Sequence, residues 1–123
     1  MANPNLVNVT NINGKTFGNV LTTSNAIIIA NASGSGNVLK INNIVVSNID
    51  GAAAADVTIE YNTAANGTGT PLRLASTISV PADATLIVTD KSTSFYLEEN
   101  TCIKGFASAA GDLEVLVSYE VLS

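Results

Sequence analysis

The fold is decided by the stretch Leu113-Glu-Val-Leu-Val-Ser-Tyr-Glu-Val-Leu122. Apolar side chains occupy every second position along it, and glutamate and serine stand at most of the positions between them. A period of two is typical of a β-strand that buries one face. The same alternation recurs over residues 56–62 and 71–80. We therefore expect half-buried strands at all three places.

Two further segments, residues 26–30 and 39–49, are richer in consecutive isoleucine and valine. Such runs predict strands that are covered on both sides, either in the middle of a sandwich or at a contact between subunits. Three consecutive isoleucines, Ile27, Ile28 and Ile29, would turn at least one side chain to the outer face of an ordinary strand. This run is therefore a candidate interface, and a doubly covered core strand is the alternative.

Residues that favour turns separate these segments at intervals of about eight to twelve residues, the spacing of an all-β sandwich or barrel. They lie at residues 13–14, 34–37, 50–51, 66–69, 81–83, 90–92, 99–100 and 111–112. The pattern predicts an all-β fold, a single β-sandwich of about eight to nine strands. It leaves a jelly-roll order and an immunoglobulin-like order as the two possibilities.

The 123 residues suffice for one domain. We expect the sandwich to occupy residues 13–123 and to follow an extended N-terminal arm of residues 1–12. The start of this arm has little apolar content and would need a neighbouring subunit to order it. Its candidate interface residues are Ala2, Asn3, Pro4, Asn5 and Leu6.

Charge is sparse and acidic, with five basic against ten acidic residues and a formal net charge of -5. The phosphate backbone of a nucleic acid would be repelled by this balance, so we expect no direct nucleic-acid binding. No run approaches the roughly 20 apolar residues that span a bilayer, and the start lacks the pattern of a secretion signal. We therefore expect no membrane partner, anchor or signal peptide.

The chain contains no histidine. It therefore lacks the usual general base near neutral pH, and triads that depend on histidine cannot form. Glu98 and Glu99 are adjacent, so on a strand they would point to opposite faces, which suits a solvated strand end better than paired catalytic carboxylates. We expect a protein that is not an enzyme and that carries no cofactor or resident metal. Calcium held by the carboxylates of Asp50, Asp56, Asp83 and Asp90 is a less favoured alternative to ordinary turns.

Cys102 is the single cysteine, so it cannot form a disulfide within the chain. Its place beside Ile103 favours a buried, unreactive thiol. Sugar-binding modules usually stack sugars on exposed aromatic rings. Tyr61 and Tyr119 fall on apolar strand faces, which leaves Tyr96 and Phe106 as the aromatic candidates for a carbohydrate surface.

Several segments carry a resemblance to a known group of proteins. They are residues 1–10, the Asn-Gly-Lys-Thr of 13–16, Val-Ser-Asn-Ile-Asp-Gly with its alanines and Asp-Val-Thr-Ile-Glu in 46–60, Val-Pro-Ala-Asp-Ala-Thr-Leu-Ile-Val in 80–88, Tyr-Leu-Glu-Glu in 96–99 and Gly-Asp-Leu-Glu-Val-Leu-Val-Ser-Tyr-Glu in 111–120. Together they resemble small virion structural proteins of tailed phages, especially phages that infect cyanobacteria. Asn100-Thr101-Cys102 replaces the Gly-Asp-Ser turn that the group has after Tyr-Leu-Glu-Glu.

The resemblance implies a β-sandwich, with jelly-roll order as one form, that is assembled into a virion. The favoured role is a capsid decoration or cement protein that docks on the outer shell, contacts the major capsid protein and forms a homo-oligomer, with a trimer favoured. A neck, tail or fibre subunit and a carbohydrate- or receptor-binding module on the particle are the alternatives. The shared motifs include no catalytic signature.

Overall fold

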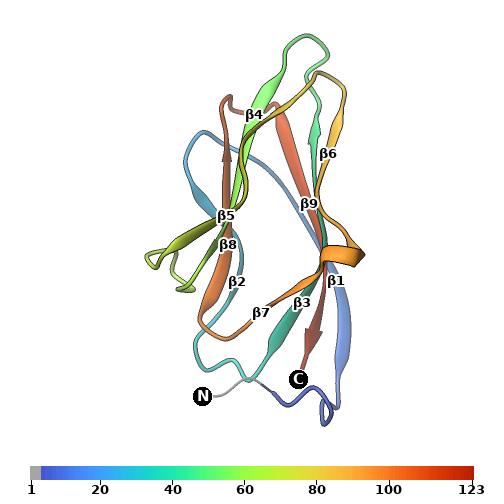
Figure 1. Cartoon of the computed structure of the whole chain (residues 1–123), viewed down its shortest axis with the longest axis vertical. Helices are drawn as coiled ribbons and strands as arrows, with labels where there is room; N and C mark the ends of the chain where they lie inside the picture. Colours follow the sequence, from blue (N-terminus) through green and yellow to red (C-terminus); the bar gives the residue numbers. More distant parts are fainter. Residues whose placement is uncertain (1–3) are drawn as a thin grey trace.

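A computed structural model describes residues 4–123, which fold into two antiparallel sheets packed face to face (Figure 1). The elements are β1 (Ile12–Val20), β2 (Ala26–Asn31), β3 (Val38–Asn48), β4 (Ala55–Asn62), β5 (Pro71–Val80), β6 (Thr85–Thr89), a short 3-10 helix η1 (Lys91–Thr93), β7 (Phe95–Leu97), β8 (Thr101–Ala107) and β9 (Leu113–Leu122). The predicted all-β sandwich is confirmed. The N-terminal candidates Ala2 and Asn3 lie outside the described residues.

The strand order distinguishes the two topologies that the sequence leaves open. One sheet has the order β1-β9-β3-β6, with the short β7 also paired to β3, and the other has the order β2-β8-β4-β5. We call them the first sheet and the second sheet. This interleaving of the strands between a five-stranded sheet and a four-stranded sheet is the jelly roll. Figure 1 shows the first sheet on the right and the second on the left.

The core lies between the sheets and is built mainly from aliphatic side chains. In β9 the predicted alternation is confirmed over residues 113–117, because Leu113, Val115 and Val117 are buried while Glu114 and Leu116 are exposed, and it is lost at the end of the strand, where residues 118–121 are all half-buried and Leu122 is buried. The largest fully buried side chains of the other strands include Ile41, Ile44, Ile59, Leu97 and Ile103. No helix within residues 4–123 has the length and the apolar character that crossing a membrane requires.

β4 differs from the expected half-buried strand because it is buried on both faces. Thr58, Glu60 and Asn62 point away from the core, yet each is at most 5% exposed. Neighbouring segments cover them. The amide Nδ2 of Asn25 donates to Oε1 of Glu60 at 3.0 Å, and the backbone of Thr77 donates to Oγ1 of Thr58 at 3.1 Å.

β5 departs from its predicted alternation in the opposite direction. Its pairing with β4 shifts register twice, between Val57 and Ile59 and again between Ile59 and Glu60. β-Bulges of this kind bend a strand and re-aim its side chains. Three apolar residues that the period of two assigns to the buried face, Leu72, Leu74 and Ile78, are exposed on this edge strand, although Leu72 and Ile78 pair with the core-facing Tyr61 and Val57.

Asn13-Gly14, expected to form a turn, instead lies inside β1, which pairs with β9 without a shift of register. The asparagines that do organise turns are buried at strand ends. Asn31, Asn48 and Asn62 are the last residues of β2, β3 and β4, and each side-chain amide donates to two backbone carbonyls. Much of the asparagine in this sequence therefore serves to close loops onto the sandwich.

Candidate functional site

A row of apolar residues crosses the outer face of the first sheet. Gly18 of β1 pairs with Leu116 of β9, Leu116 with Val45 of β3, and Val45 with Ile87 of β6. Leu116 is 49% exposed and Ile87 is 62% exposed. We call these four residues the outer row. An exposed apolar surface that spans several strands is typical of a protein contact site.

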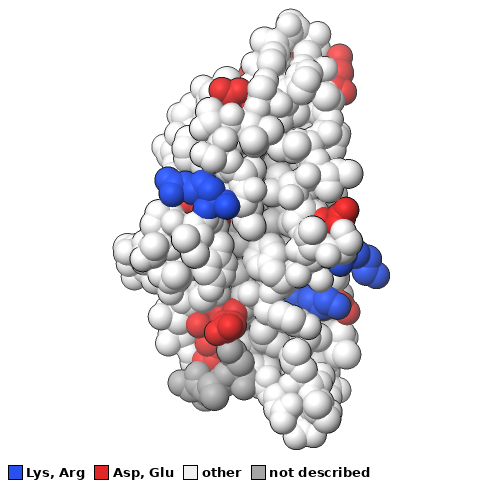
Figure 2. Space-filling model, in the orientation of Figure 1, with Lys and Arg blue, Asp and Glu red and all other residues white. Residues whose placement is uncertain are grey.

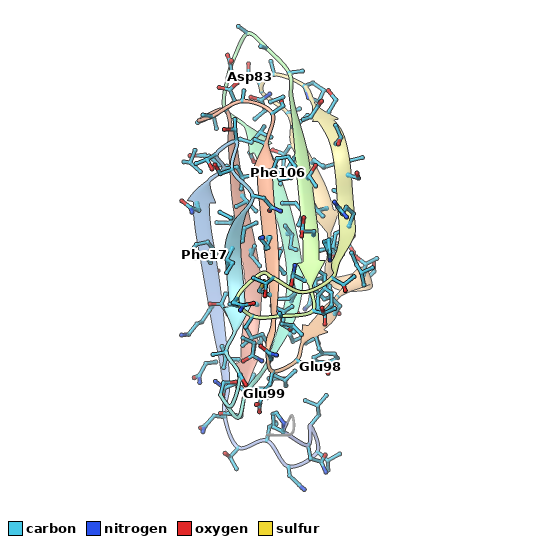
Figure 3. The ribbon with its side chains drawn as sticks, turned by 90° about the vertical axis from the view of Figure 1, so that its left-hand side faces the viewer. Phe17, Asp83, Glu98, Glu99 and Phe106 are labelled. Atoms are coloured by element: carbon cyan, nitrogen blue, oxygen red, sulfur yellow. The ribbon has the colours of Figure 1, made fainter. Side chains whose placement is uncertain are left out.

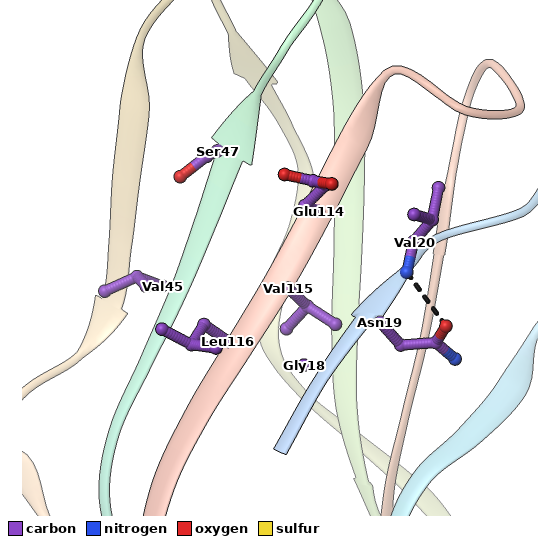
Figure 4. A pocket seen from close by; sticks show the side chains of 8 residues that line it. All are labelled: Gly18, Asn19, Val20, Val45, Ser47, Glu114, Val115 and Leu116. Carbon is purple, nitrogen blue, oxygen red and sulfur yellow. Dashed lines mark hydrogen bonds between the residues drawn. The ribbon is translucent and has the colours of Figure 1, made fainter. Parts of the chain in front are cut away.

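A shallow groove lies over the β1 end of the outer row (Figure 4). Its volume is about 500 Å³, and the residues that line it are Gly18, Asn19, Val20, Val45, Ser47, Glu114, Val115 and Leu116. Gly18 makes room for Leu116, since a Cβ atom at this position would lie 3.0 Å from Cδ1 of Leu116. The leucine side chain can therefore lie across β1. Val20, which is 42% exposed, extends the apolar lining toward the end of that strand.

Charged side chains are sparse around the sandwich. Figure 2 shows a few scattered lysine, arginine, aspartate and glutamate side chains with broad uncharged areas between them on the face in view. Glu114 is the charged residue in the lining of the groove. A groove of this composition suits an apolar side chain of a partner better than a charged substrate.

The three isoleucines of β2 have different environments. A register shift places Ile28 as an extra residue between Ile27, which pairs with Lys104, and Ile29, which pairs with Ile103. This bulge turns two successive side chains inward, so Ile28 and Ile29 are 8% and 7% exposed. Ile27 is 43% exposed. Within the run, Ile27 alone has an exposed side chain, and the doubly covered core strand is not what forms.

The described part of the N-terminal arm folds back against the subunit. The backbone N–H groups of Thr10 and Asn11 both donate to the carbonyl of Ser123, and the N–H of Asn8 donates to the carbonyl of Asn5. Pro4 and Leu6 line a second small groove of about 240 Å³, which they share with Val38, Tyr96 and Glu98. Asn5 is exposed and Leu6 is 45% exposed.

The side chains that could hold a metal ion are dispersed. Within residues 4–123, no three of the cysteine and carboxylate side chains come close enough together to bind one. Figure 3 places Asp83 near one end of the sandwich and Glu98 and Glu99 near the other. Asp50 and Asp90 accept backbone N–H bonds from Ala52 and Ser92, so they act within their own turns.

Glu99 has a structural role that differs from the solvated strand end expected from the sequence. Its carboxylate accepts the N–H groups of Gly34 and Gly36, at 3.0 Å and 3.2 Å. Both glycines have a positive φ, which other residues rarely adopt. Glu99 therefore ties the loop between β2 and β3 to the loop that precedes β8. Glu98 is exposed.

Aromatic rings contribute little to the accessible surface. Tyr96 is 43% exposed, while Phe17, Tyr61, Phe95, Phe106 and Tyr119 are all partly buried. Tyr96 lies on the short β7, beside Lys40 of β3. Stacking of a sugar chain generally uses more than one exposed ring. Among the aromatic residues, Tyr96 alone is exposed, so this surface is a poor candidate for sugar binding.

Cys102 is fully buried on the outer side of β8, beneath the loop of residues 62–70. Its Sγ lies 3.3 Å from the carbonyl oxygen of Ala64. Burial raises the pKa of the Cys102 thiol, and the nearby charge of Lys104 opposes this only in part. The thiol is thus kept protonated over a wider pH range than an exposed cysteine.

We expect iodoacetamide to modify Cys102 at least roughly 100-fold more slowly in the native subunit than in the urea-unfolded chain, because the thiolate is the nucleophile and the native thiol is covered. The raised pKa means that the native rate should keep rising at pH values where the unfolded rate has levelled. Mass spectrometry of the alkylated chain over time would measure both rates. Equal rates would show that the loop of residues 62–70 does not cover the thiol in solution.

Comparison with known proteins bears on the fold. No protein-family model matches the chain, and no curated protein matches it in sequence. The solved structure of a subunit from a Bacillus endospore appendage, a disulfide-linked pilus, is similar to the whole chain. The match covers 100% of this chain and 96% of the pilus chain, with a TM-score of 0.55 and 16% sequence identity. At this identity the likeness shows a shared fold.

Sequence reasoning missed the outer row, although a signal for it is present. Val45, Ile87 and Leu116 are each the middle residue of three consecutive apolar residues, as Ile28 is. On a regular strand the two flanking residues face the core and the middle one faces out. The signal holds for these three positions and fails for Ile28, because β2 is bulged there.

Proposed function

We propose that this chain is a non-enzymatic structural subunit of a multi-copy extracellular particle. The specific form that we propose is a decoration protein on the outer capsid surface of a tailed phage. The outer row carries the proposal, because an exposed apolar surface across four strands gives a rigid face for attachment to a shell. The resemblance to virion structural proteins supports a location on a phage particle. The fold shared with a pilus subunit supports a structural role.

The chemistry of the surface agrees with attachment rather than turnover. The groove is lined mainly by apolar and uncharged atoms from β1, β3 and β9, and Glu114 supplies its charged group. These strands belong to the hydrogen-bonded first sheet, so the attachment face is held by the fold itself. Many copies of such a face, each burying modest area, would stabilise a shell by mass action.

The copy number of the protein in purified particles tests this proposal most directly. Quantitative mass spectrometry against the major capsid protein should give a ratio near one to one, or one to a few. A ratio of one to tens would favour a neck, tail or fibre subunit instead. Absence from washed particles would overturn the virion setting.

Leu116→Asp should weaken attachment to capsids that lack the protein by at least about tenfold. A leucine buried at an interface contributes roughly 1.5–3 kcal/mol, and a carboxylate in its place adds a desolvation cost. The matched control is Leu72→Asp, on the exposed edge of the second sheet, where the leucine is 58% exposed. Co-sedimentation with capsids would measure both variants. Wild-type binding by Leu116→Asp, or equal losses in the two variants, would contradict docking through the outer row.

A further inference from the structure

The strands at the edges of the two sheets are protected to different degrees against pairing with another chain. β2 is bulged at Ile28, β5 begins with Pro71 and shifts register twice, and β6 is short and also shifts register. Bulges, proline and short length are among the features by which edge strands avoid unwanted partners, and charged side chains, above all lysine, are another. β1 has none of the first three, and Lys15 is its one charged residue. It runs for 9 residues in unbroken register with β9, and its other side pairs with no strand of residues 4–123.

The pairing with β9 shows which backbone groups of β1 face its free side. Asn11 and Ser123 exchange both of their backbone hydrogen bonds, and the N–H of Leu21 donates to the carbonyl of Leu113. Odd-numbered residues therefore bond to β9, and the alternation of an antiparallel ladder turns the even-numbered ones outward. The outward set is Ile12, Gly14, Thr16, Gly18 and Val20. The N–H of Val20 agrees with this, because it is bonded to its neighbour's side chain, Oδ1 of Asn19, at 2.9 Å (Figure 4).

The sequence of β1 is nearly symmetric about its centre. Reading outward from Thr16 in both directions, the residues pair by kind: Lys15 with Phe17, Gly14 with Gly18, Asn13 with Asn19 and Ile12 with Val20. An interface with two-fold symmetry brings the same surface of two copies together, so it requires a surface that is complementary to itself. An antiparallel pair of β1 strands centred on Thr16 meets this requirement at every position.

We propose that β1 pairs with β1 of a second copy, antiparallel and centred on Thr16, to join the first sheets of two subunits into one continuous sheet. The even-numbered residues would then exchange backbone hydrogen bonds across the two-fold axis, and the N–H of Val20 would give up its bond to Oδ1 of Asn19 for one to the carbonyl of Ile12 of the second copy. This contact lies along the edge of β1 and shares Gly18 with the outer row, but it is tested by the oligomeric state of the free subunit and does not depend on the proposed attachment to a capsid. Because each subunit has one β1 edge, this pairing joins two copies and yields a dimer. The virion resemblance favours a trimer instead.

The side chains of β1 suit this register on both faces of the joined sheet. Ile12, 61% exposed, would lie opposite Val20 of the second copy on the outer face. Gly14 and Gly18 would face each other there without steric conflict. On the other face the alkyl chain of Lys15 would pack on the ring of Phe17, with the ammonium group near its π-face. The two Lys15 side chains would not be directly opposite each other, which avoids repulsion of like charges.

A cysteine at the symmetry centre tests both the pairing and its register. In the background of Cys102→Ala, Thr16→Cys should form a disulfide-linked dimer under mild oxidation. Opposed residues in a hydrogen-bonded antiparallel pair have Cα atoms about 5.5 Å apart, within the range for a disulfide. The matched control is Thr85→Cys, an exposed threonine on the other edge strand of the same sheet, which should remain largely uncrosslinked.

A mixture of Ile12→Cys and Val20→Cys subunits, in the same background, tests the antiparallel register separately. The mixture should yield crosslinked heterodimers, while each variant alone should not, because residue 12 lies opposite residue 20 only across the pair. Non-reducing gels and mass spectrometry would identify the products. Crosslinking of each variant with itself would indicate a different register and overturn the proposal.

Thr16→Pro should weaken dimer formation while leaving the subunit folded. The N–H that proline removes points to the free side of β1, where proline is tolerated on an edge strand. Sedimentation equilibrium of the full chain should show a monomer–dimer equilibrium that this substitution weakens by at least about tenfold, equivalent to 1.4 kcal/mol. A trimer, a monomer at all concentrations, or crosslinking of Thr16→Cys no greater than that of Thr85→Cys would overturn the pairing.

Discussion

Ile28→Asp should unfold the isolated subunit or lower its free energy of unfolding by at least about 4 kcal/mol, the combined effect of losing a buried isoleucine and burying a carboxylate. Ile28 is 8% exposed, and its Cδ1 lies close to Gly105, where a Cβ atom would come within 2.9 Å of it. The same hypothetical Cβ would lie 2.7 Å from Cδ1 of Ile59. The space over Gly105 is therefore filled by these two side chains, and an aspartate would have no water there.

The neighbouring substitution Ile27→Asp is the matched control. Ile27 is 43% exposed and pairs with Lys104 on the outer side of β2, so an aspartate there should change stability by about 1 kcal/mol or less. Urea unfolding followed by far-UV circular dichroism would compare the two variants, since the chain has no tryptophan for fluorescence. Equal stability of Ile28→Asp and Ile27→Asp would show that the bulge does not turn Ile28 into the core.

Asn62→Ala should destabilise the subunit by about 2–4 kcal/mol, because it leaves four partly buried backbone groups of the loop without their partner and empties a buried site. The Asn62 side chain is 2% exposed and acts as both hydrogen-bond donor and hydrogen-bond acceptor toward the loop. Its Nδ2 donates to the carbonyls of Gly67 and Gly69, and its Oδ1 accepts from the N–H groups of Ala64 and Gly69. No other side chain bonds this loop, residues 62–70, at so many points among the described contacts.

Local opening gives a second readout for Asn62→Ala. The loop covers Cys102, so alkylation of this thiol should accelerate under conditions where circular dichroism still shows a folded subunit. Asn66→Ala is the control, because Asn66 is exposed in the same loop and bonds to Thr68 alone in the structure. It should change stability by about 1 kcal/mol or less. Unchanged alkylation in Asn62→Ala would indicate that other contacts hold the loop.

The candidate site could be predicted from the sequence in part. The arm and the isoleucine run were the expected contact residues, and Leu6 and Ile27 do present apolar side chains to solvent. Ile28 and Ile29 do not, because a bulge adds a residue to β2 and rotates both side chains inward. Bulges depend on the partner strand as well as on local residues, so the alternation rule cannot anticipate them.

The sequence by itself determined the class of fold, because the period of two and the spacing of turn residues depend on near neighbours in the chain. It also determined which face of β9 is buried. The tertiary structure alone decided the jelly-roll order and the outer row. Val45, Ile87 and Leu116 align only because hydrogen bonds set the register between strands that are far apart in the chain. The long, unbulged edge of β1 has the same origin, since a strand is at an edge only by virtue of what the rest of the fold places beside it.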